Sequence, residues 1–170
     1  MKIYLGELNM ELLKVIKFEG DDNTIVYKHP AEDFNTQSQL IVHQSQEAIF
    51  FKDGEALDLF GPGRYTLNTQ NIPILRNIIN IPTECVSPFH CEVYFINKVM
   101  TFNTEWGTSN RFEILDPTFG VPLSIGASGT IEFKIFDSRK FLVNVVGTQE
   151  ELSKNDLIRY FKGKIITKFK

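Results

Sequence analysis

A chain of 170 residues suits one folded domain, and its net charge of −3 argues against a dedicated nucleic-acid binder. Nucleic-acid-binding domains carry a basic surface, whereas acidic side chains here outnumber basic ones by 21 to 18. Hydrophobic residues make up 42% of the chain and include fifteen Phe, which is enough to fill a β-rich core.

The sequence lacks the signals of export and of a membrane-crossing helix. No apolar run approaches the ~20 residues that span a bilayer. The N-terminal segment, residues 1–20, has no signal-peptide core. Two cysteines do not make a disulfide framework. These observations predict an intracellular, cytoplasmic domain.

Two strands are expected before residue 30. Residues 10–18 (MELLKVIKF) fit a strand, although their apolar positions also recur at helical spacing. A turn at Gly20–Asn23 and the strand-forming run Thr24–Tyr27 favour the strand. The sequence therefore predicts a hairpin from about Leu12 to Lys28.

The segment from Val42 to Leu67 is predicted to form three strands joined by two tight turns. Ala48–Phe51 is a run of strand formers, and Gly54 can take the positive φ that a hairpin turn requires. Gly61–Gly63, with Pro between the glycines, ends the second strand and starts the third. This pattern specifies a sheet and names no reaction.

After Leu67 the spacing of the apolar residues changes from that of a strand to that of a helix. Asn68 or Thr69 can cap a short helix whose apolar residues, up to Ile79, cover the sheet or touch a lipid surface. Within residues 89–102, apolar residues alternate on both sides of a strand, which indicates a central position in a sheet covered on both faces.

Further strands are expected at residues 106–108 and 112–115, continuing the same sheet. Residues 121–125 and 131–135 both alternate and are predicted to pair with each other in antiparallel fashion. Asp137 or Ser138 can cap a short helix that follows.

A C-terminal amphipathic helix is predicted from Thr148 to Lys170. Thr148–Glu151 has the pattern of a capping box, in which each side chain satisfies a free amide at a helix start. Lysines and one arginine dominate the polar side, and they suit either solvent or anionic lipid headgroups. The sequence thus divides into a domain at 1–147 and a helix at 148–170. The residues expected to contact another copy or a membrane are Leu157, Ile158, Phe161, Ile165, Phe169, Lys162 and Lys168.

No motif points to catalysis or to a cofactor. Cys85, His90 and Cys91 could be metal ligands, but a structural zinc site needs four ligands, usually in closely spaced pairs. Adjacent strand residues also point to opposite faces. Gly61–Arg64 does not match a phosphate-binding loop, because a strand and not a helix follows it. We therefore predict no catalytic, metal or cofactor site.

Several ordered segments of the chain are similar to a known family. They are QSQEAIFFKDG at 44–54, FGPGRYTL at 60–67, NIPIL at 71–75, SPF at 87–89, EVYFIN at 92–97 and WGT at 106–108. In this order they resemble the SPFH (stomatin, prohibitin, flotillin) or band 7 family, in its bacterial "virion core protein-like" branch. The resemblance covers about Leu12 to Gly147. It implies a membrane-associated scaffold that oligomerises, without catalytic residues.

These inferences combine into one expectation. The fold is α+β, a mostly antiparallel twisted sheet covered by short helices, with a C-terminal helix. The function that the resemblance implies is a non-enzymatic, self-associating scaffold, peripheral at the inner membrane surface. The alternative is a soluble adaptor for another protein, with no membrane role.

Overall fold

The computed structural model describes residues 14–34, 38–52, 54–67, 89–98, 102–147 and 149–169. They belong to two compact units. One comprises residues 1–99 and 135–153, and the other comprises residues 100–134 and 154–170. The predicted helix at 68–79 and Cys85 lie outside the described residues. The predicted division at residue 147 concerns the family domain and stays a prediction.

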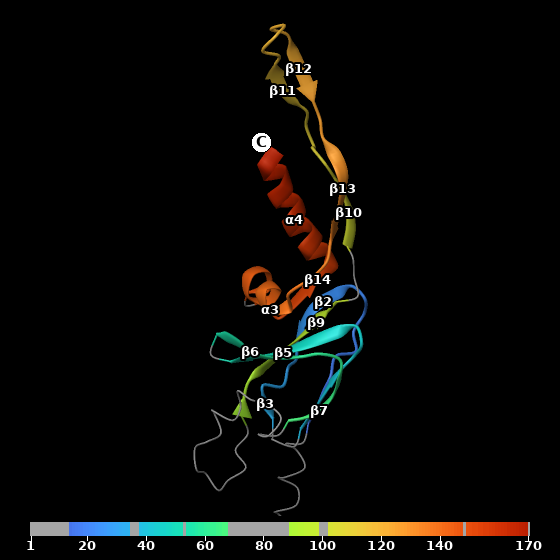
Figure 1. The fold of residues 1–170 in the computed structure, drawn as a ribbon, viewed down its shortest axis with the longest axis vertical. Coiled ribbons are helices and arrows are strands. Elements are labelled where there is room, and N and C mark those ends of the chain that lie inside the picture. Colours follow the sequence, from blue (N-terminus) through green and yellow to red (C-terminus); the bar gives the residue numbers. More distant parts are fainter. Residues whose placement is uncertain are drawn as a thin grey trace, which may run out of the picture. The chain divides into compact units, whose positions relative to one another are not determined.

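A five-stranded antiparallel sheet forms the centre of the first unit (Figure 1). Its strand order is β14-β2-β9-β5-β6, and each strand is antiparallel to its neighbours. The strands are β2 (Thr24–Lys28), β5 (Gln46–Lys52), β6 (Glu55–Phe60), β9 (Glu92–Asn97) and β14 (Glu151–Ser153).

A smaller sheet supplies the other half of the core. It has the order β1-β4-β7, formed by β1 (Val15–Ile16), β4 (Gln39–Val42) and β7 (Gly63–Thr66). A short pair, β3 (Asp33–Phe34) with β8 (Phe89–His90), is also antiparallel. The buried cluster joins Ile16, Leu40 and Val42 of the small sheet to residues on one face of β5 and β9. Those residues are Ala48, Phe50, Val93 and Phe95.

The opposite face of β5 and β9 lies toward a short helical segment, α3 (Ser138–Phe141) followed by η1 (Leu142–Val146). Asp137 caps α3, because its side chain accepts a hydrogen bond from the backbone N–H of Lys140. The Ser138 hydroxyl donates to Glu47 Oε2 on β5 at 2.5 Å, which ties α3 to the sheet. The capping predicted at Asp137 is therefore confirmed.

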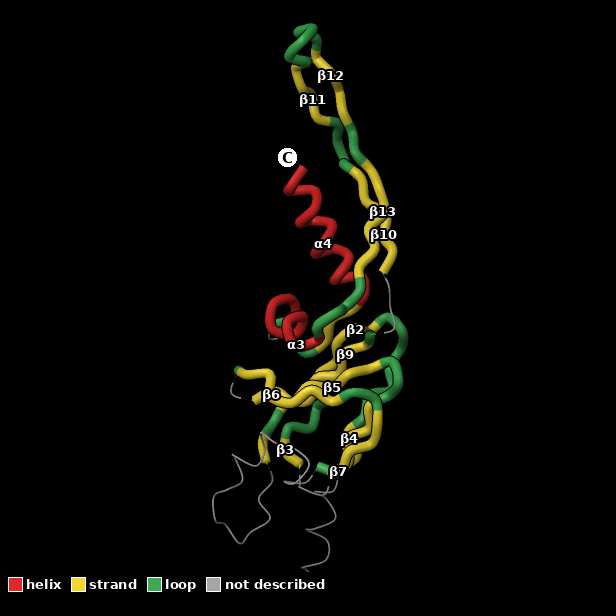
Figure 2. Tube along the Cα trace, in the orientation of Figure 1, coloured by secondary structure: helices red, strands yellow, loops and turns green. Residues whose placement is uncertain are grey.

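The second unit is a long β-ribbon and a helix. Its strands are β10 (Phe102–Gly107), β11 (Phe112–Leu115), β12 (Pro122–Ile125) and β13 (Ser128–Phe133), and the helix is α4 (Lys154–Phe169). β10 pairs with β13 and β11 pairs with β12, so the two strand runs lie side by side up to one turn (Figure 2). The ring of Phe161 on α4 lies 5.0 Å from that of Phe133 on β13.

The α+β class with a mostly antiparallel arrangement is confirmed, since β1–β4 is the one parallel pair among the described strands. The hairpin between β5 and β6 is also confirmed, with Gly54 at φ 85° in its turn. Strand β9 is central, and its four inner residues are buried on both faces, as predicted.

Three predicted strand pairings are wrong. β1 and β2 do not form a hairpin, because β1 joins β4, where Ile16 is fully buried, while β2 lies between β9 and β14. The third strand of the expected meander, β7, pairs with β4 and not with β6. β12 and β13 do not pair with each other, because each continues the ribbon opposite an earlier strand.

The predicted capping box is also wrong. Glu151 lies in strand β14 and not in the first turn of a helix, and α4 begins at Lys154. The carboxylate of Glu151 instead accepts a hydrogen bond from the Thr24 hydroxyl at 3.2 Å. β14 pairs with β2 and forms one edge of the five-stranded sheet, so β2 is no longer an unpaired edge strand. Leu152 of β14 is buried there.

Candidate functional site

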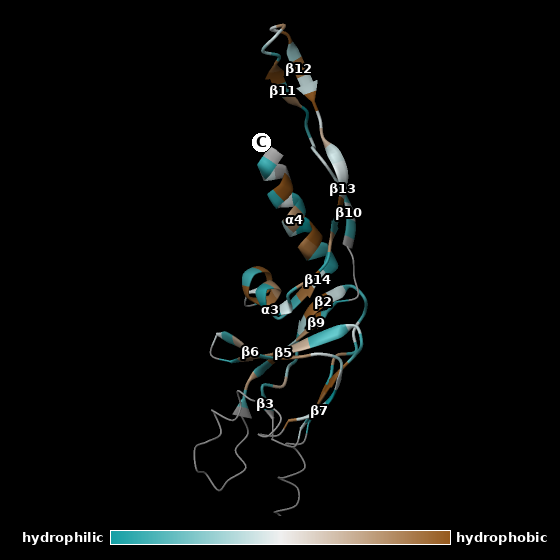
Figure 3. Cartoon of the chain, viewed as in Figure 1, coloured by the Kyte–Doolittle hydropathy of each residue, from teal (hydrophilic) through white to brown (hydrophobic). Residues whose placement is uncertain are grey.

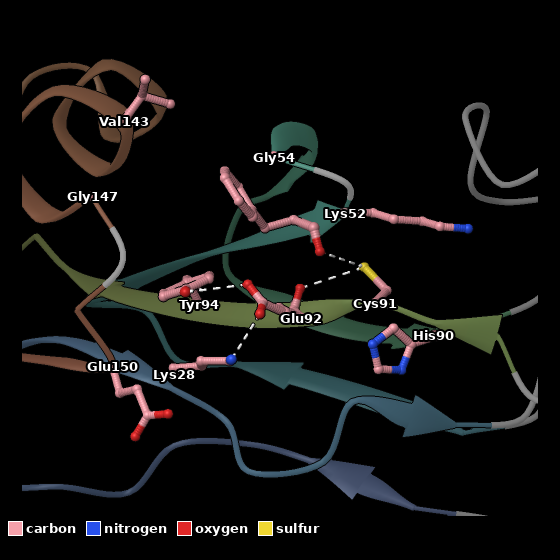
Figure 4. A pocket seen from close by; sticks show the side chains of 11 residues that line it. Lys28, Lys52, Gly54, His90, Cys91, Glu92, Tyr94, Val143, Gly147 and Glu150 are labelled. Carbon is pink, nitrogen blue, oxygen red and sulfur yellow. Dashed lines mark hydrogen bonds and ion pairs between the residues drawn. The ribbon is translucent and has the colours of Figure 1, made fainter.

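In the first unit, one lysine lies between two glutamates. Lys28 Nζ on β2 lies 2.7 Å from Oε1 of Glu92 on β9 and 2.7 Å from Oε1 of Glu32. The phenol of Tyr94 donates to the second oxygen of Glu92 at 3.2 Å. Figure 4 shows Lys28 and Tyr94 turned toward Glu92. Two segments that are distant in sequence, residues 28–32 and residues 92–94, are joined by this network.

The contacts in this network shift the pKa values of Lys28, Glu32 and Tyr94. The hydrogen bond and positive charge of Lys28 hold the pKa of the Glu32 carboxyl below its usual range. Hydrogen bonds to Glu32 and Glu92 raise the pKa of Lys28. Burial, together with the charge of Glu92, raises the pKa of Tyr94 to about 12. At neutral pH the lysine is charged and the phenol is protonated.

A cleft of about 580 Å³ opens beside this network and is lined by Cys91, His90, Lys52 and Val143 among others. Burial raises the pKa of the Cys91 thiol to about 12, so it stays protonated at neutral pH and is a poor nucleophile. The thiol donates weakly to the carbonyl oxygen of Phe51 at 3.4 Å. Cys91 therefore behaves as a small core residue.

Of the three candidate metal ligands the structure describes His90 and Cys91, and their side chains do not share a site. His90 is exposed, and its Nδ1 lies 3.0 Å from Oδ1 of Asp33, whereas the Cys91 thiol is buried in the core. Within the described ranges, no group of three or more His, Cys, Asp or Glu side chains is placed to hold a metal ion. Two of the charged residues that line the cleft, Lys28 and Glu92, are paired with each other.

The helix residues predicted to contact a partner are arranged around α4. Leu157 is buried, so the apolar stripe of α4 is partly covered within the chain itself. Ile158, Phe161, Ile165 and Lys162 are half-buried, and Lys168 is exposed. The side chain of Phe169 lies outside the described residues. As contacts in an assembly, these residues stay a prediction.

The sequence analysis did not identify a second apolar surface, which lies in the unit that contains α4. Strands β11 and β12, with the turn between them, carry six of the large apolar side chains that are exposed in the described part of the chain. They are Ile114, Leu115, Phe119, Val121, Leu123 and Ile125. The signal was present as alternating apolar residues at 121–125, but these were interpreted only as a strand paired with residues 131–135.

Comparison with known proteins identifies the family. The model of the SPFH domain-Band 7 family matches residues 26–170. The chain belongs to this family. The SPFH match includes the five-stranded sheet except the first two residues of β2, and it includes the Lys28 network, the ribbon and α4.

One curated relative of this SPFH domain is the uncharacterized protein YdjI of Bacillus subtilis (strain 168). It is 28% identical over 151 residues, which are 86% of this chain and 46% of YdjI, so the chain spans about half the length of that relative. No solved structure matches the chain. None of the helices in the described part has the length and apolar composition needed to cross a bilayer.

Proposed function

We propose that this SPFH domain is a non-enzymatic scaffold that self-associates and that it acts in the cytoplasm, peripherally bound at the inner face of the cell membrane. The observation that carries the proposal is the family match over residues 26–170, because SPFH proteins are typically membrane-associated scaffolds. Placement in the virion core protein-like branch is part of the same proposal, and it rests on the ordered segments between residues 44 and 108.

The geometry of the first unit supports a structural role. Lys28 is paired with two carboxylates and the Cys91 thiol is buried, so neither is available as a base or a nucleophile. Seven of the eleven large apolar side chains that are exposed in the described residues lie in the second unit, on the ribbon and on α4. The same helix exposes Arg159, Lys164 and Lys168. Surfaces of this composition suit binding to macromolecules or lipid headgroups more than catalysis.

We expect the full chain to have a mass above that of the monomer in light scattering at tens of micromolar. A variant that ends at Ser153 keeps β14 in the sheet but lacks α4, and it should associate more weakly because the helix is a predicted contact. Circular dichroism of the shortened variant serves as the control for folding. A full chain that is strictly monomeric would contradict the self-association part of the proposal.

Membrane association is expected to depend on charge. Lys168, Lys164 and Arg159 are exposed on α4, and each basic residue near an anionic surface contributes ~1 kcal/mol of attraction. The chain should therefore sediment with vesicles that contain phosphatidylserine and be released by added salt, which screens the attraction. Vesicles of phosphatidylcholine alone are the control. Equal binding to both, or binding to neither, would favour the soluble adaptor.

A further inference from the structure

The distal part of the ribbon has one face made only of apolar side chains. In the register of β11 and β12, Phe112 lies opposite Ile125 and Ile114 lies opposite Leu123, so these four side chains share a face. Ile114, Leu123 and Ile125 are 47%, 40% and 44% exposed. Figure 3 shows the hydrophobic colour of β11. We call these four residues the ribbon face.

The turn beyond the ribbon face adds to it and is well formed. The Asp116 carboxylate accepts hydrogen bonds from the backbone N–H groups of Thr118 at 2.8 Å and Phe119 at 2.9 Å. The turn therefore holds Phe119 in place although its side chain is 79% exposed. Two-stranded hairpins are marginally stable in water without a partner surface. An ordered hairpin with this much exposed apolar area indicates an interaction site.

The charges around the ribbon indicate what kind of partner fits. Between Phe102 and Phe133 there are four acidic residues and one basic residue. The acidic residues are Glu105, Glu113, Asp116 and Glu132, and the basic residue is Arg111. Glu113 lies between two ribbon-face residues of β11 and therefore points to the opposite side, so the negative charge surrounds the ribbon face and is not part of it. A ribbon with this net charge is repelled by anionic lipid headgroups and attracted by a basic partner that also offers apolar or aromatic contacts.

Helix α4 is basic, and it exposes Arg159, Lys164 and Lys168. Five basic residues and one acidic residue lie between Lys154 and Phe169. Arg159, Tyr160 and Lys164 are exposed, and the ammonium of Lys164 lies 4.5 Å from the centre of the Tyr160 ring. The inner side of α4 contacts its own ribbon through Phe161 and Phe133. We call Arg159, Tyr160 and Lys164 the outer helix face.

We propose that the ribbon face of one copy binds the outer helix face of a second copy. This inference rests on the proposed self-association and names the two surfaces that make it. The contact is heterologous, because each chain offers one surface of each kind, so the assembly extends into a ring or a linear array. A surface of a few side chains is smaller than the ~800 Å² per partner of a tight complex, so each contact is expected to be weak.

Two variants of the full chain test the inference. The ribbon variant carries Ile114→Thr and Leu123→Thr, which remove apolar surface and place β-branched side chains, favourable in strands, at both positions. The helix variant carries Arg159→Glu and Lys164→Glu, which reverse two exposed charges. We expect light scattering to give the monomer mass for each variant alone, whereas the unchanged chain associates.

A mixture of the two variants distinguishes the proposed contact between ribbon and helix from other modes of self-association. The ribbon variant keeps an intact outer helix face and the helix variant keeps an intact ribbon face, so an equimolar mixture should form two-chain species and nothing larger. That recovery also shows that both variants are folded. Val143→Thr, which removes a 55% exposed apolar side chain from η1, is the matched control and should associate like the unchanged chain.

The possible outcomes separate the inference from the proposed function. If the unchanged chain is monomeric, self-association and the inference both fail. If the unchanged chain associates and the two variants do so equally, or if their mixture stays monomeric, the inference fails and the proposed function stands. Loss of binding to phosphatidylserine vesicles by the ribbon variant, with assembly unchanged, would assign the ribbon face to lipid and overturn the inference.

Discussion

Replacing Phe95 with alanine is expected to lower the free energy of unfolding by about 3–5 kcal/mol, the usual cost of emptying a large aromatic site in a core. Phe95 lies on β9, the middle strand of the five-stranded sheet, and its side chain is 1% exposed. It belongs to the cluster that joins the two sheets of the first unit, and its ring centre is 6.2 Å from that of Phe18. Urea unfolding followed by far-ultraviolet circular dichroism measures the loss.

The chain offers a matched control for this substitution. Phe136→Ala removes the same atoms from a side chain that is 94% exposed, so its cost should be within about 0.5 kcal/mol. Comparing the two variants separates burial from any general effect of replacing phenylalanine. If both variants lost the same stability, Phe95 would not have the role in the core that the structure assigns to it.

Elements whose pattern is set by neighbouring residues could be predicted from the sequence. Strand β9 is recognisable because apolar residues occur on both of its sides, which is characteristic of a strand covered on both faces. The β5–β6 hairpin follows from two strand-forming runs around Gly54, which tolerates a positive φ. Asp137 is identifiable as a cap for the same reason, since capping involves only the next few residues.

Strand pairing depends on residues that are distant in sequence, and there the predictions were wrong. A short strand such as β1 can pair with any strand that buries Ile16, and the structure uses β4 instead of the nearer β2. Alternation in β12 shows that one side is apolar, but it does not show whether anything covers that side. Ile125 is an example: its side chain is 44% exposed, although the alternation around it resembles that of a half-buried strand.

The same limit applies to the polar network. Lys28, Glu32 and Glu92 belong to no recognisable motif, and Glu92 is separated from the other two by most of the first unit's sequence. They meet because β2 and β9 are neighbours in the sheet, with Lys28 paired opposite Tyr94. Only knowledge of that register places the ammonium between two carboxylates.

Replacing Lys28 with glutamine is expected to lower the free energy of unfolding by about 1–2 kcal/mol, below the usual cost of breaking a buried ion pair because the carboxylates are partly exposed. The Lys28 side chain is only 14% exposed, while that of Glu92 is 30% exposed. The variant leaves Glu92 without its cation. Lys17→Gln is the control, because the Lys17–Glu19 pair is exposed and such pairs contribute little.

The stability difference between the unchanged chain and Lys28→Gln should depend on pH in a defined direction. The pKa of Glu32 is lowered by Lys28, so its contribution is complete above the ordinary value of 4.5 and is lost as the pH falls through the lower, folded-state pKa. The pKa of Lys28 is raised, so its contribution is complete at every pH below the ordinary value of 10.5. The difference should therefore be constant from pH 6 to pH 9 and shrink below about pH 4. Urea unfolding of both proteins across this range measures it, and a difference that grew on acidification would rule out the ion pair as its source.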